Sequence, residues 1–444
     1  MVEPTRVRLV DRATTVADGD RLAAAGRLEE ALAAYRAALA RAPDNPEVRS
    51  NLGNVLLGLG RTDEALATYR VVLEGGFDHP LVYYNMGTAL RALGRPEQAL
   101  PAFLEALARA PGFASAHNNR GNALRDLERY AEAAAAYLDA LALRPDDAGI
   151  RVNLSSVLSL LHEQETAGAE GGEATGRPET AATLAQRWRM AHPDDPMARH
   201  VAAAMTGEPP PLRAEDGYVR QLFDGFAVDF DRQLTALDYP VPWLLPAILA
   251  RFWPQPPVPG LAVLDAGCGT GLAAAALRPY ARTLTGVDLS PNMLELAQRR
   301  GLYDGLEAAE VTAFLTGHCD AFDLIIVADV LCYFGELEPV LMAAAAALHP
   351  GGRLVFTVEL DPDPSAPPFT LQPNGRYRHP PTAITAALGN AGLDAPAPTV
   401  FVLRRENGRV VPGGLVEANL MCPEALSPRE LRNPTKRSES GSGG

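Results

Sequence analysis

The residues most able to do chemistry form one short stretch in the second half of the chain. It reads L-D-A-G-C-G-T-G over residues 264–271 and follows an apolar run that predicts a strand. Its three glycines allow backbone angles that a β-carbon forbids, and they let the main chain approach a ligand closely at the start of the alanine-rich helix predicted after them. We therefore interpret the stretch as strand, tight loop and helix, with the loop as a nucleoside-binding site.

A carboxylate stands where such a site needs one. Asp288 follows Gly267 by 21 residues, at the end of a second predicted strand, and its two oxygens suit the two hydroxyl donors of a ribose. A dinucleotide loop has the spacing G-x-G-x-x-G, but the third position here is Leu272, and Gly271 comes one residue early. The spacing therefore argues against a dinucleotide.

The elements that must position these residues alternate after the loop. We expect strands at 283–288, 322–329 and 353–360, and helices at 291–300 and 337–348. Such alternation builds a parallel sheet covered by helices on both faces, and ligands bind at the carboxyl ends of its strands. The acidic residues that follow or end predicted strands are Asp265, Asp288, Glu310 and Asp329. We therefore expect them at one edge of the sheet.

The D-A-G-C-G-T-G segment, together with V-D-L-S-P at 287–291, resembles class I S-adenosylmethionine-dependent methyltransferases. The resemblance covers about residues 212–422 and implies an α/β, Rossmann-like domain with S-adenosyl-L-methionine as cofactor. It implies that the three loop glycines, Gly267, Gly269 and Gly271, pass the methionine moiety and ribose of the cofactor. Asp265 then lies near the cofactor's amino group or braces the loop.

The same resemblance implies the remaining cofactor contacts. Asp288 binds the ribose hydroxyls, and Leu289 lies against the adenine face. Glu310 stands where the family usually has an aspartate that reaches the adenine amino group, although its side chain is longer. Asp329 lies next to the reactive methyl group and is a candidate catalytic residue.

Residues that act on the methyl acceptor are expected in a loop after the fifth strand. The segment N-G-R-Y-R-H at 374–379 offers Tyr377 or His379 to orient or deprotonate the acceptor, and Arg376 to hold a carboxylate. Each of the three is equally well explained as an exposed loop residue. Methyl transfer from a sulfonium needs mainly positioning and exclusion of water, so the acceptor atom stays open.

Upstream, the first third of the chain repeats itself every 34 residues. A column of glycines and, 16 residues later, a column of aromatic residues recur four times: Gly19, Gly53, Gly87 and Gly121, then Tyr35, Tyr69, Phe103 and Tyr137. Small residues where helices approach each other and aromatic residues that fill gaps indicate stacked helix pairs. The pattern resembles the tetratricopeptide repeat and implies an all-α solenoid.

One further column has two interpretations. Asn51, Asn85, Asn119 and Asn153 also stand 34 residues apart. In the tetratricopeptide family this column faces the concave groove, where its amides can hold an extended peptide. Alternatively, the asparagines bond neighbouring helices to one another. We lean slightly towards the groove, and thus towards a protein or peptide partner.

Composition limits the other possibilities. A net charge of −14 argues against broad binding to nucleic acids. The four cysteines show no metal-binding or disulfide spacing, so we expect no metal site and a reducing, cytoplasmic location. No apolar run reaches the length of a signal peptide or a membrane span, so we expect no membrane partner.

We expect a multidomain chain. Its segments are a repeat array with a closing helix (14–162), a linker (163–178), connecting or capping helices (179–206), the methyltransferase domain (207–422) and a disordered tail (423–444). A helix with Phe223, Phe226 and Phe230 on one face precedes the glycine loop, either as core packing or as a lid over the ligand.

Our leading hypothesis is a methyltransferase whose repeats recruit a protein or peptide for methylation. The alternatives are a methyltransferase for small molecules whose repeats serve assembly, and a scaffold with an inactive methyltransferase fold. The intact glycine loop, Asp288 and Asp329 argue against the scaffold.

Overall fold

A computed structural model describes residues 16–168, 179–227, 230–237, 239–256, 260–406 and 409–420. The chain divides into two compact units, residues Met1–Leu184 and Ala185–Gly444, and each is described by itself. The expected tail over 423–444 lies outside the described residues, as does most of the expected linker. Among the helices that the structure describes, none is long and apolar enough to cross a membrane.

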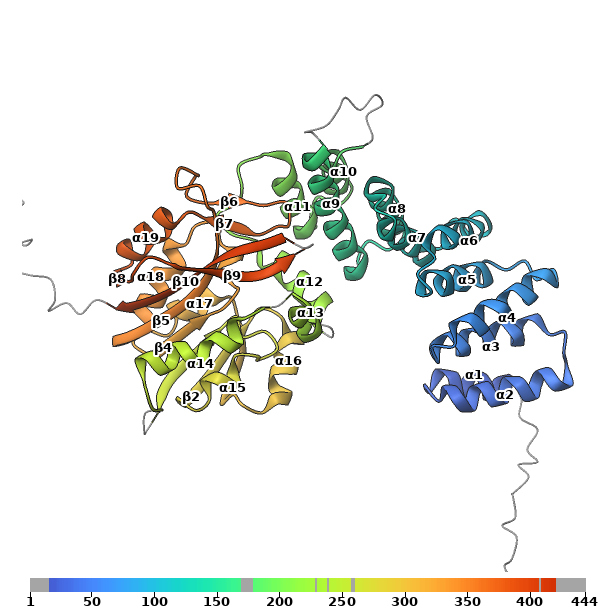
Figure 1. Cartoon of the computed structure of the whole chain (residues 1–444), viewed down its shortest axis with the longest axis horizontal. Helices are drawn as coiled ribbons and strands as arrows, with labels where there is room; N and C mark the ends of the chain where they lie inside the picture. Colours follow the sequence, from blue (N-terminus) through green and yellow to red (C-terminus); the bar gives the residue numbers. More distant parts are fainter. Residues whose placement is uncertain are drawn as a thin grey trace, which may run out of the picture. The chain divides into compact units, whose positions relative to one another are not determined.

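The first unit is built from paired helices (Figure 1). The pairs are α1 (Val16–Ala24) with α2 (Leu28–Arg41), α3 (Pro46–Gly58) with α4 (Thr62–Glu74), α5 (Pro80–Ala92) with α6 (Pro96–Arg109), and α7 (Ala114–Asp126) with α8 (Tyr130–Leu143). The helix α9 (Ala148–Gly168) follows them. Residues 163–168, which we expected in a linker, continue this helix as far as Gly168.

The glycine and aromatic columns of the repeat pack directly on each other. A β-carbon on Gly53 would lie 2.6 Å from Cε1 of Tyr69, and one on Gly87 would lie 2.7 Å from Cε1 of Phe103. Real Cβ atoms do not approach ring carbons this closely, because close-packed interiors leave no spare volume. Each glycine therefore gives the aromatic ring of the same repeat the space it needs to be buried.

The second unit is built around one mixed β-sheet (Figure 1). Its strands are β1 (Leu261–Ala266), β2 (Ala281–Asp288), β3 (Gly305–Ala308), β4 (Phe322–Val327), β5 (Leu348–Leu360), β6 (Thr370–Leu371), β7 (Tyr377–His379), β8 (Leu393–Asp394), β9 (Thr399–Glu406) and β10 (Arg409–Leu420). The main strand order is β3-β2-β1-β4-β5-β10-β8, with β9 paired to β10 and β7 paired to β5. Strands β1 to β5 run parallel, and β10 runs antiparallel to β5.

The helices of this unit precede the sheet or connect its strands. They are α11 (Pro196–Thr206), α12 (Asp216–Phe226), α13 (Phe230–Ala236), α14 (Val241–Phe252), α15 (Ala274–Leu277), α16 (Pro291–Arg300), α17 (Val311–Thr316), α18 (Glu338–Ala347) and α19 (Pro381–Asn390); α10 (Ala181–Ala191) spans the division between the units. The short 3-10 helix η2 (Leu331–Tyr333) follows β4.

Apolar side chains of the central strands form the core that fixes the sheet. Val263 of β1 and Leu324 of β4 belong to one buried cluster with Leu245 and Leu249 of α14. Burying such side chains contributes about 1.5–3 kcal/mol each. The order of β1 and β4 in the sheet creates a switch point, where the chain leaves the two neighbouring strands in opposite directions and a ligand site is expected. The predicted α-solenoid followed by an α/β domain is confirmed.

Candidate active site

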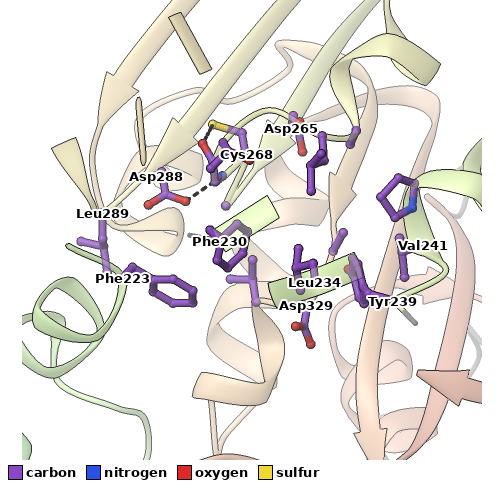
Figure 2. Close-up of a pocket in the computed structure, with 18 of the residues that line it drawn as sticks. Phe223, Phe230, Leu234, Tyr239, Val241, Asp265, Cys268, Asp288, Leu289 and Asp329 are labelled. Carbon is purple, nitrogen blue, oxygen red and sulfur yellow. Dashed lines mark hydrogen bonds between the residues drawn. The ribbon is translucent and has the colours of Figure 1, made fainter. Parts of the chain in front are cut away.

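A cavity of about 870 Å³, open solvent included, lies at the carboxyl ends of β1, β2 and β4. Figure 2 shows the carboxylates of Asp265, Asp288 and Asp329 around one hollow, with Phe230 among them. The prediction that these three residues, distant in sequence, share one edge of the sheet agrees with this arrangement.

The glycine loop forms one wall of this cavity through backbone angles that only glycine adopts easily. Gly267, Gly269 and Gly271 have φ values of 76°, 53° and 82°. Gly267 and Gly269 line the cavity, whereas Gly271 is absent from the described wall, and a β-carbon on it would lie 3.0 Å from Cε2 of Tyr303. A β-carbon on Gly267 would lie 2.1 Å from Cγ2 of Val330, another residue of the cavity wall. At Gly269 the nearest atom to such a β-carbon is Cε1 of Phe230, 3.7 Å away. The loop is therefore a cradle that a side chain would fill, which fits the close approach of a cofactor.

Asp288 connects the loop to the next strand. Its Oδ2 accepts a hydrogen bond from the Gly269 amide at 2.9 Å, and its Oδ1 accepts one from the Ser290 amide at 2.8 Å. Burial raises the pKa of this carboxyl, and these backbone hydrogen bonds oppose the shift. A carboxylate has about four lone-pair positions, so each oxygen still has room for one more donor. Asp288 can hold the loop and accept two ribose hydroxyls at once.

Asp265 lies deeper, on β1. Its side chain is buried, and the Tyr303 hydroxyl donates a hydrogen bond of 2.6 Å to its Oδ2. Burial raises the pKa of Asp265 to about 6; the hydrogen bond from Tyr303 opposes this shift, and the charge of Asp288 adds to it. Burial disfavours the ionised carboxylate of Asp265, and a cationic group placed next to it would stabilise that ionised form. We had assigned no role to Tyr303.

Glu310 does not belong to the described cavity wall. It caps the amino end of α17, where its Oε2 accepts the Ala313 amide at 2.8 Å and its Oε1 accepts the Thr312 hydroxyl at 3.0 Å. The neighbouring Val311 lines the cavity instead. Each oxygen of this cap can still accept a further donor, so the expected contact with the adenine amino group stays a prediction.

Asp329, in contrast, lines the cavity, in a strained backbone conformation. Its φ of 55° is uncommon for a residue with a side chain. Its amide donates to Oγ1 of Thr357 at 2.8 Å, and its Oδ1 accepts from Nη1 of Arg404 at 3.2 Å. Strain that is held in place by neighbouring bonds is typical of functional sites.

Behind Asp329 lies a buried ionic cluster that we did not predict from the sequence. Arg404 of β9 is fully buried and pairs with Asp329, with Glu359 of β5 and, at 2.5 Å, with Glu406. Nη1 of Arg376 lies 3.5 Å from Oε1 of Glu359 and 3.5 Å from Oε1 of Glu406. Charged residues are almost never fully buried unless they are paired. The available signal was a charge that directly follows a largely apolar run in each strand, at Glu359 after residues 354–358 and at Arg404 after residues 400–403.

Tyr377 and His379 are buried beside this cluster and are absent from the described cavity wall. The Tyr377 hydroxyl donates to the Pro211 carbonyl at 2.9 Å, and Nε2 of His379 lies 2.9 Å from the Gly335 carbonyl. Burial lowers the pKa of His379 to about 4. Their burial argues against a direct action of either residue on the acceptor, and the assignment stays a prediction. Alternate residues of a strand point to opposite faces, so β7 directs this pair into the core.

Arg376 is also placed differently from the expectation. Besides its two glutamate neighbours, its guanidinium carbon lies 5.9 Å from the centre of the Tyr333 ring. Arg376 does not line the described cavity, whereas Tyr333 does. The guanidinium is thus already engaged by groups of this chain, which argues against a direct hold on a substrate carboxylate.

Aromatic side chains cover the cavity. Phe223 of α12 and Phe230 of α13 both line it, and their ring centres are 5.9 Å apart. Phe223 also contacts the Tyr333 ring, 5.6 Å away edge to face. The described part of the expected phenylalanine stripe therefore packs on the site, which favours the lid interpretation over remote core packing; the Phe226 side chain lies outside the description.

In the repeats, each member of the asparagine column donates to the preceding helix pair. The acceptors are Asp20 Oδ1 for Asn51 (3.1 Å), Asn54 Oδ1 for Asn85 (2.6 Å), the Tyr84 hydroxyl for Asn119 (3.1 Å) and Asn118 Oδ1 for Asn153 (3.1 Å). These bonds agree with the interpretation that the column links neighbouring helices. Peptide binding by the amide oxygens stays a proposal.

Comparisons with known proteins match both parts of the chain. Residues 264–356 match the family model of a methyltransferase domain. Residues 22–86 and 84–148 each match a family model of the tetratricopeptide repeat. Both resemblances that the sequence indicated are confirmed.

Individual relatives cover smaller shares. Methyltransferase-like protein 27 of Homo sapiens is 47% identical over 85 residues, 19% of this chain and 34% of the relative. A ubiquinone biosynthesis O-methyltransferase of Bordetella avium (strain 197N) is 29% identical over 152 residues, 30% of this chain and 63% of the relative. This chain thus spans about a third of the first and under two thirds of the second.

Among solved structures, magnesium protoporphyrin IX methyltransferase from Synechocystis PCC 6803, with bound SAH, is similar to this chain. It has 18% sequence identity and a TM-score of 0.37, and the match covers 47% of this chain and 100% of that one.

Proposed function

Because this chain joins tetratricopeptide repeats to a methyltransferase domain of the S-adenosylmethionine-dependent kind, we propose that it methylates a protein or peptide recruited by the repeats. The observation that carries the methyl-transfer part of the proposal is the cavity, which brings the glycine loop, Asp288 and Asp329 together under an aromatic cover. The repeats support the recruitment part. The free cysteines Cys268, Cys319 and Cys332 support a reducing compartment, which we take to be the cytoplasm.

The cofactor supplies a methyl group on a sulfonium, which is already a good electrophile. Gly267 and Gly269, which line the cavity, would give its methionine and ribose moieties a close approach to the backbone, and Gly271 would support the turn of the loop. Asp288 accepts the ribose hydroxyls with the lone pairs that its two amide bonds leave open. Asp265 and Leu289 both line the cavity. Asp265 would attract the cofactor's amino group, and Leu289 would lie against the adenine.

The other residues of the cavity orient the acceptor and exclude water. Phe223, Phe230 and Tyr333 cover the cavity with aromatic rings. Asp329 presents a carboxylate that its bond to Arg404 holds in one orientation. Much of the rate of such a reaction comes from alignment in a site without water. Asp329 serves as the hydrogen-bond acceptor for the group that is methylated.

A second candidate is a small-molecule acceptor, with the repeats used for assembly. The apolar lining of the cavity favours it, because a compact aromatic molecule would be well buried there. The relative from Bordetella avium is named a ubiquinone biosynthesis O-methyltransferase, which points in the same direction. The asparagine bonds within the repeats leave less amide capacity for a peptide.

One experiment separates the two candidates. The full chain is incubated with methyl-labelled S-adenosylmethionine and cell lysate, and the label is then followed into protein and into the small-molecule fraction. The proposal expects label in protein, reduced in an Asn85→Ala, Asn119→Ala double variant. Label in small molecules alone, at a rate that the double variant leaves unchanged, would replace our proposal by the second candidate.

A further inference from the structure

The charges around Asp329 restrict what the cavity can accept. Resting on the proposed function, we propose that the methyl acceptor has an apolar body, presents an O–H or N–H group, and carries no negative charge. The inference comes from the cavity wall and from the ionic cluster behind it.

All the charged side chains of the described cavity wall are acidic. They are Asp265, Asp288 and Asp329, and no arginine, lysine or histidine lines the described wall. The first two are engaged by the glycine loop, by Ser290 and by Tyr303. Because Asp265 and Asp288 are also assigned to the cofactor, Asp329 is the charged side chain of the described wall that an acceptor would face, and an anionic acceptor would meet a charge of its own sign.

The arginines nearest to Asp329 have no spare charge to offer an anion. Arg404 is fully buried among Asp329, Glu359 and Glu406. Arg376 faces the same two glutamates, and Nε of Arg378 lies 3.6 Å from Oε2 of Glu359. Three guanidinium groups thus stand against three carboxylates. A further carboxylate next to Asp329 would add a negative charge without a partner, which is costly in a partly buried site.

Asp329 itself is built to accept a proton-bearing group. Its backbone is fixed by the bond to Thr357, and its Oδ1 is fixed by Arg404. Its side chain is 18% exposed and belongs to the cavity wall, and its Oδ2 has no hydrogen-bond partner among the described residues. One oxygen is thus anchored, and the other is available to a donor in the cavity.

The body of the acceptor is recognised by apolar surface. Phe223, Phe230, Leu234, Tyr239 and Tyr333 line the cavity. The edge-to-face contacts of Phe223 with Phe230 and with Tyr333 fix the ring faces that an acceptor meets. Aromatic rings bury large areas and prefer offset or edge-to-face neighbours. Both a tyrosine-like side chain of a protein and a free phenol have this chemistry.

The transfer step balances with these groups alone. The acceptor's oxygen or nitrogen forms a bond to the methyl carbon, and the carbon–sulfur bond breaks, with its electron pair passing to sulfur to give a neutral thioether. The proton of the acceptor passes to Oδ2 of Asp329. No oxidant or metal takes part.

Three matched probes test the inference on the full chain saturated with S-adenosylhomocysteine. They are 4-butylphenol, 4-butylbenzylamine and 4-butylbenzoate, which share one body and differ in the head group. Calorimetry should find that the phenol and the amine bind about tenfold or more tightly than the benzoate. Equal or tighter binding of the benzoate, or binding of none of the three, would overturn the inference.

Variants locate the effect. Asp329→Asn should narrow the difference in affinity between the phenol and the benzoate, because it removes the negative charge. Asparagine also tolerates the left-handed backbone at this position. Asp320→Asn is the matched control, since Asp320 is exposed, has a φ of 51° and does not line the described cavity. An unchanged preference in Asp329→Asn contradicts the inference. S-adenosylhomocysteine binding is measured first: its absence sinks the proposed function as well, whereas binding without the expected preference sinks only this inference.

Discussion

Replacing Gly267 by alanine tests the glycine loop most sharply. Alanine in the left-handed conformation at φ 76° costs about 1–2 kcal/mol. Its β-carbon would lie 2.1 Å from Cγ2 of Val330, and overpacking of this kind adds about 1–3 kcal/mol. We therefore expect Gly267→Ala to lower the free energy of unfolding of the second unit by about 2–5 kcal/mol.

The substitution should also weaken ligand binding. Val330 lines the cavity next to Asp329, so any shift that relieves the clash moves the wall that the cofactor meets. We expect the affinity for S-adenosylhomocysteine to fall by about tenfold or more, measured by calorimetry at a temperature where the variant is folded. Unfolding is followed in urea through the transition that the ligand shifts, since a chain with two units need not unfold in one step.

Gly301→Ala supplies the control. Gly301 has a φ of 65°, and a β-carbon there would meet nothing within 4 Å. The Gly301→Ala variant should therefore lose only about 1–2 kcal/mol of unfolding free energy, from the backbone conformation, and should keep its affinity for the ligand. If Gly267→Ala proved no less stable than Gly301→Ala and bound the ligand as tightly as wild type, the close contact that we assign to the loop would be refuted.

Three further predictions follow from the same structure. The pKa of Asp265 is about 6, and its ionised form attracts the cofactor's amino group, so the affinity for S-adenosylhomocysteine should fall as the pH drops below about 6. Calorimetry should show a weaker pH dependence of this affinity in Asp265→Asn. An equally steep pH profile in the variant would exclude the contact. Arg404→Met should lower the free energy of unfolding by about 3–5 kcal/mol, because it leaves Glu359 buried without its closest cation; a loss below 1 kcal/mol in urea would count against the cluster. Gly87→Ala should destabilise the repeats by about 1–3 kcal/mol through its contact with the aromatic column, whereas Gly112→Ala, with open space around it, should not; equal melting temperatures of the two variants would contradict the packing.

Local patterns in the sequence predicted the parts of the site that depend on local geometry. The alternate glycines allow the positive φ values that a tight loop uses, and the structure shows such values at all three. The repeat spacing of Gly53 and Tyr69 indicates a packing contact within one helix pair. Asp288 could be placed because a parallel sheet brings the carboxyl ends of its strands together. These features need no knowledge of side-chain partners.

The rest depends on pairings that the sequence does not reveal. Arg404 and Glu359 are 45 residues apart and meet only because β10 pairs with β5 and β9 pairs with β10. Tyr377 is buried because it lies on the face of β7 that packs on the core. A strand of three residues is too short for its sequence pattern to predict which face is buried. Glu310 was placed from the family position, and no pattern in the sequence indicated that its carboxylate caps α17.

The central claim is that this cavity holds S-adenosylmethionine through the loop and Asp288. It is tested most directly by calorimetric titration of S-adenosylhomocysteine into the wild-type chain and into Asp288→Ala. We predict binding to one site per chain in the wild type, and an affinity lower by about tenfold or more in the variant. No binding to the folded wild-type chain, or equal affinity in the two proteins, would contradict the account.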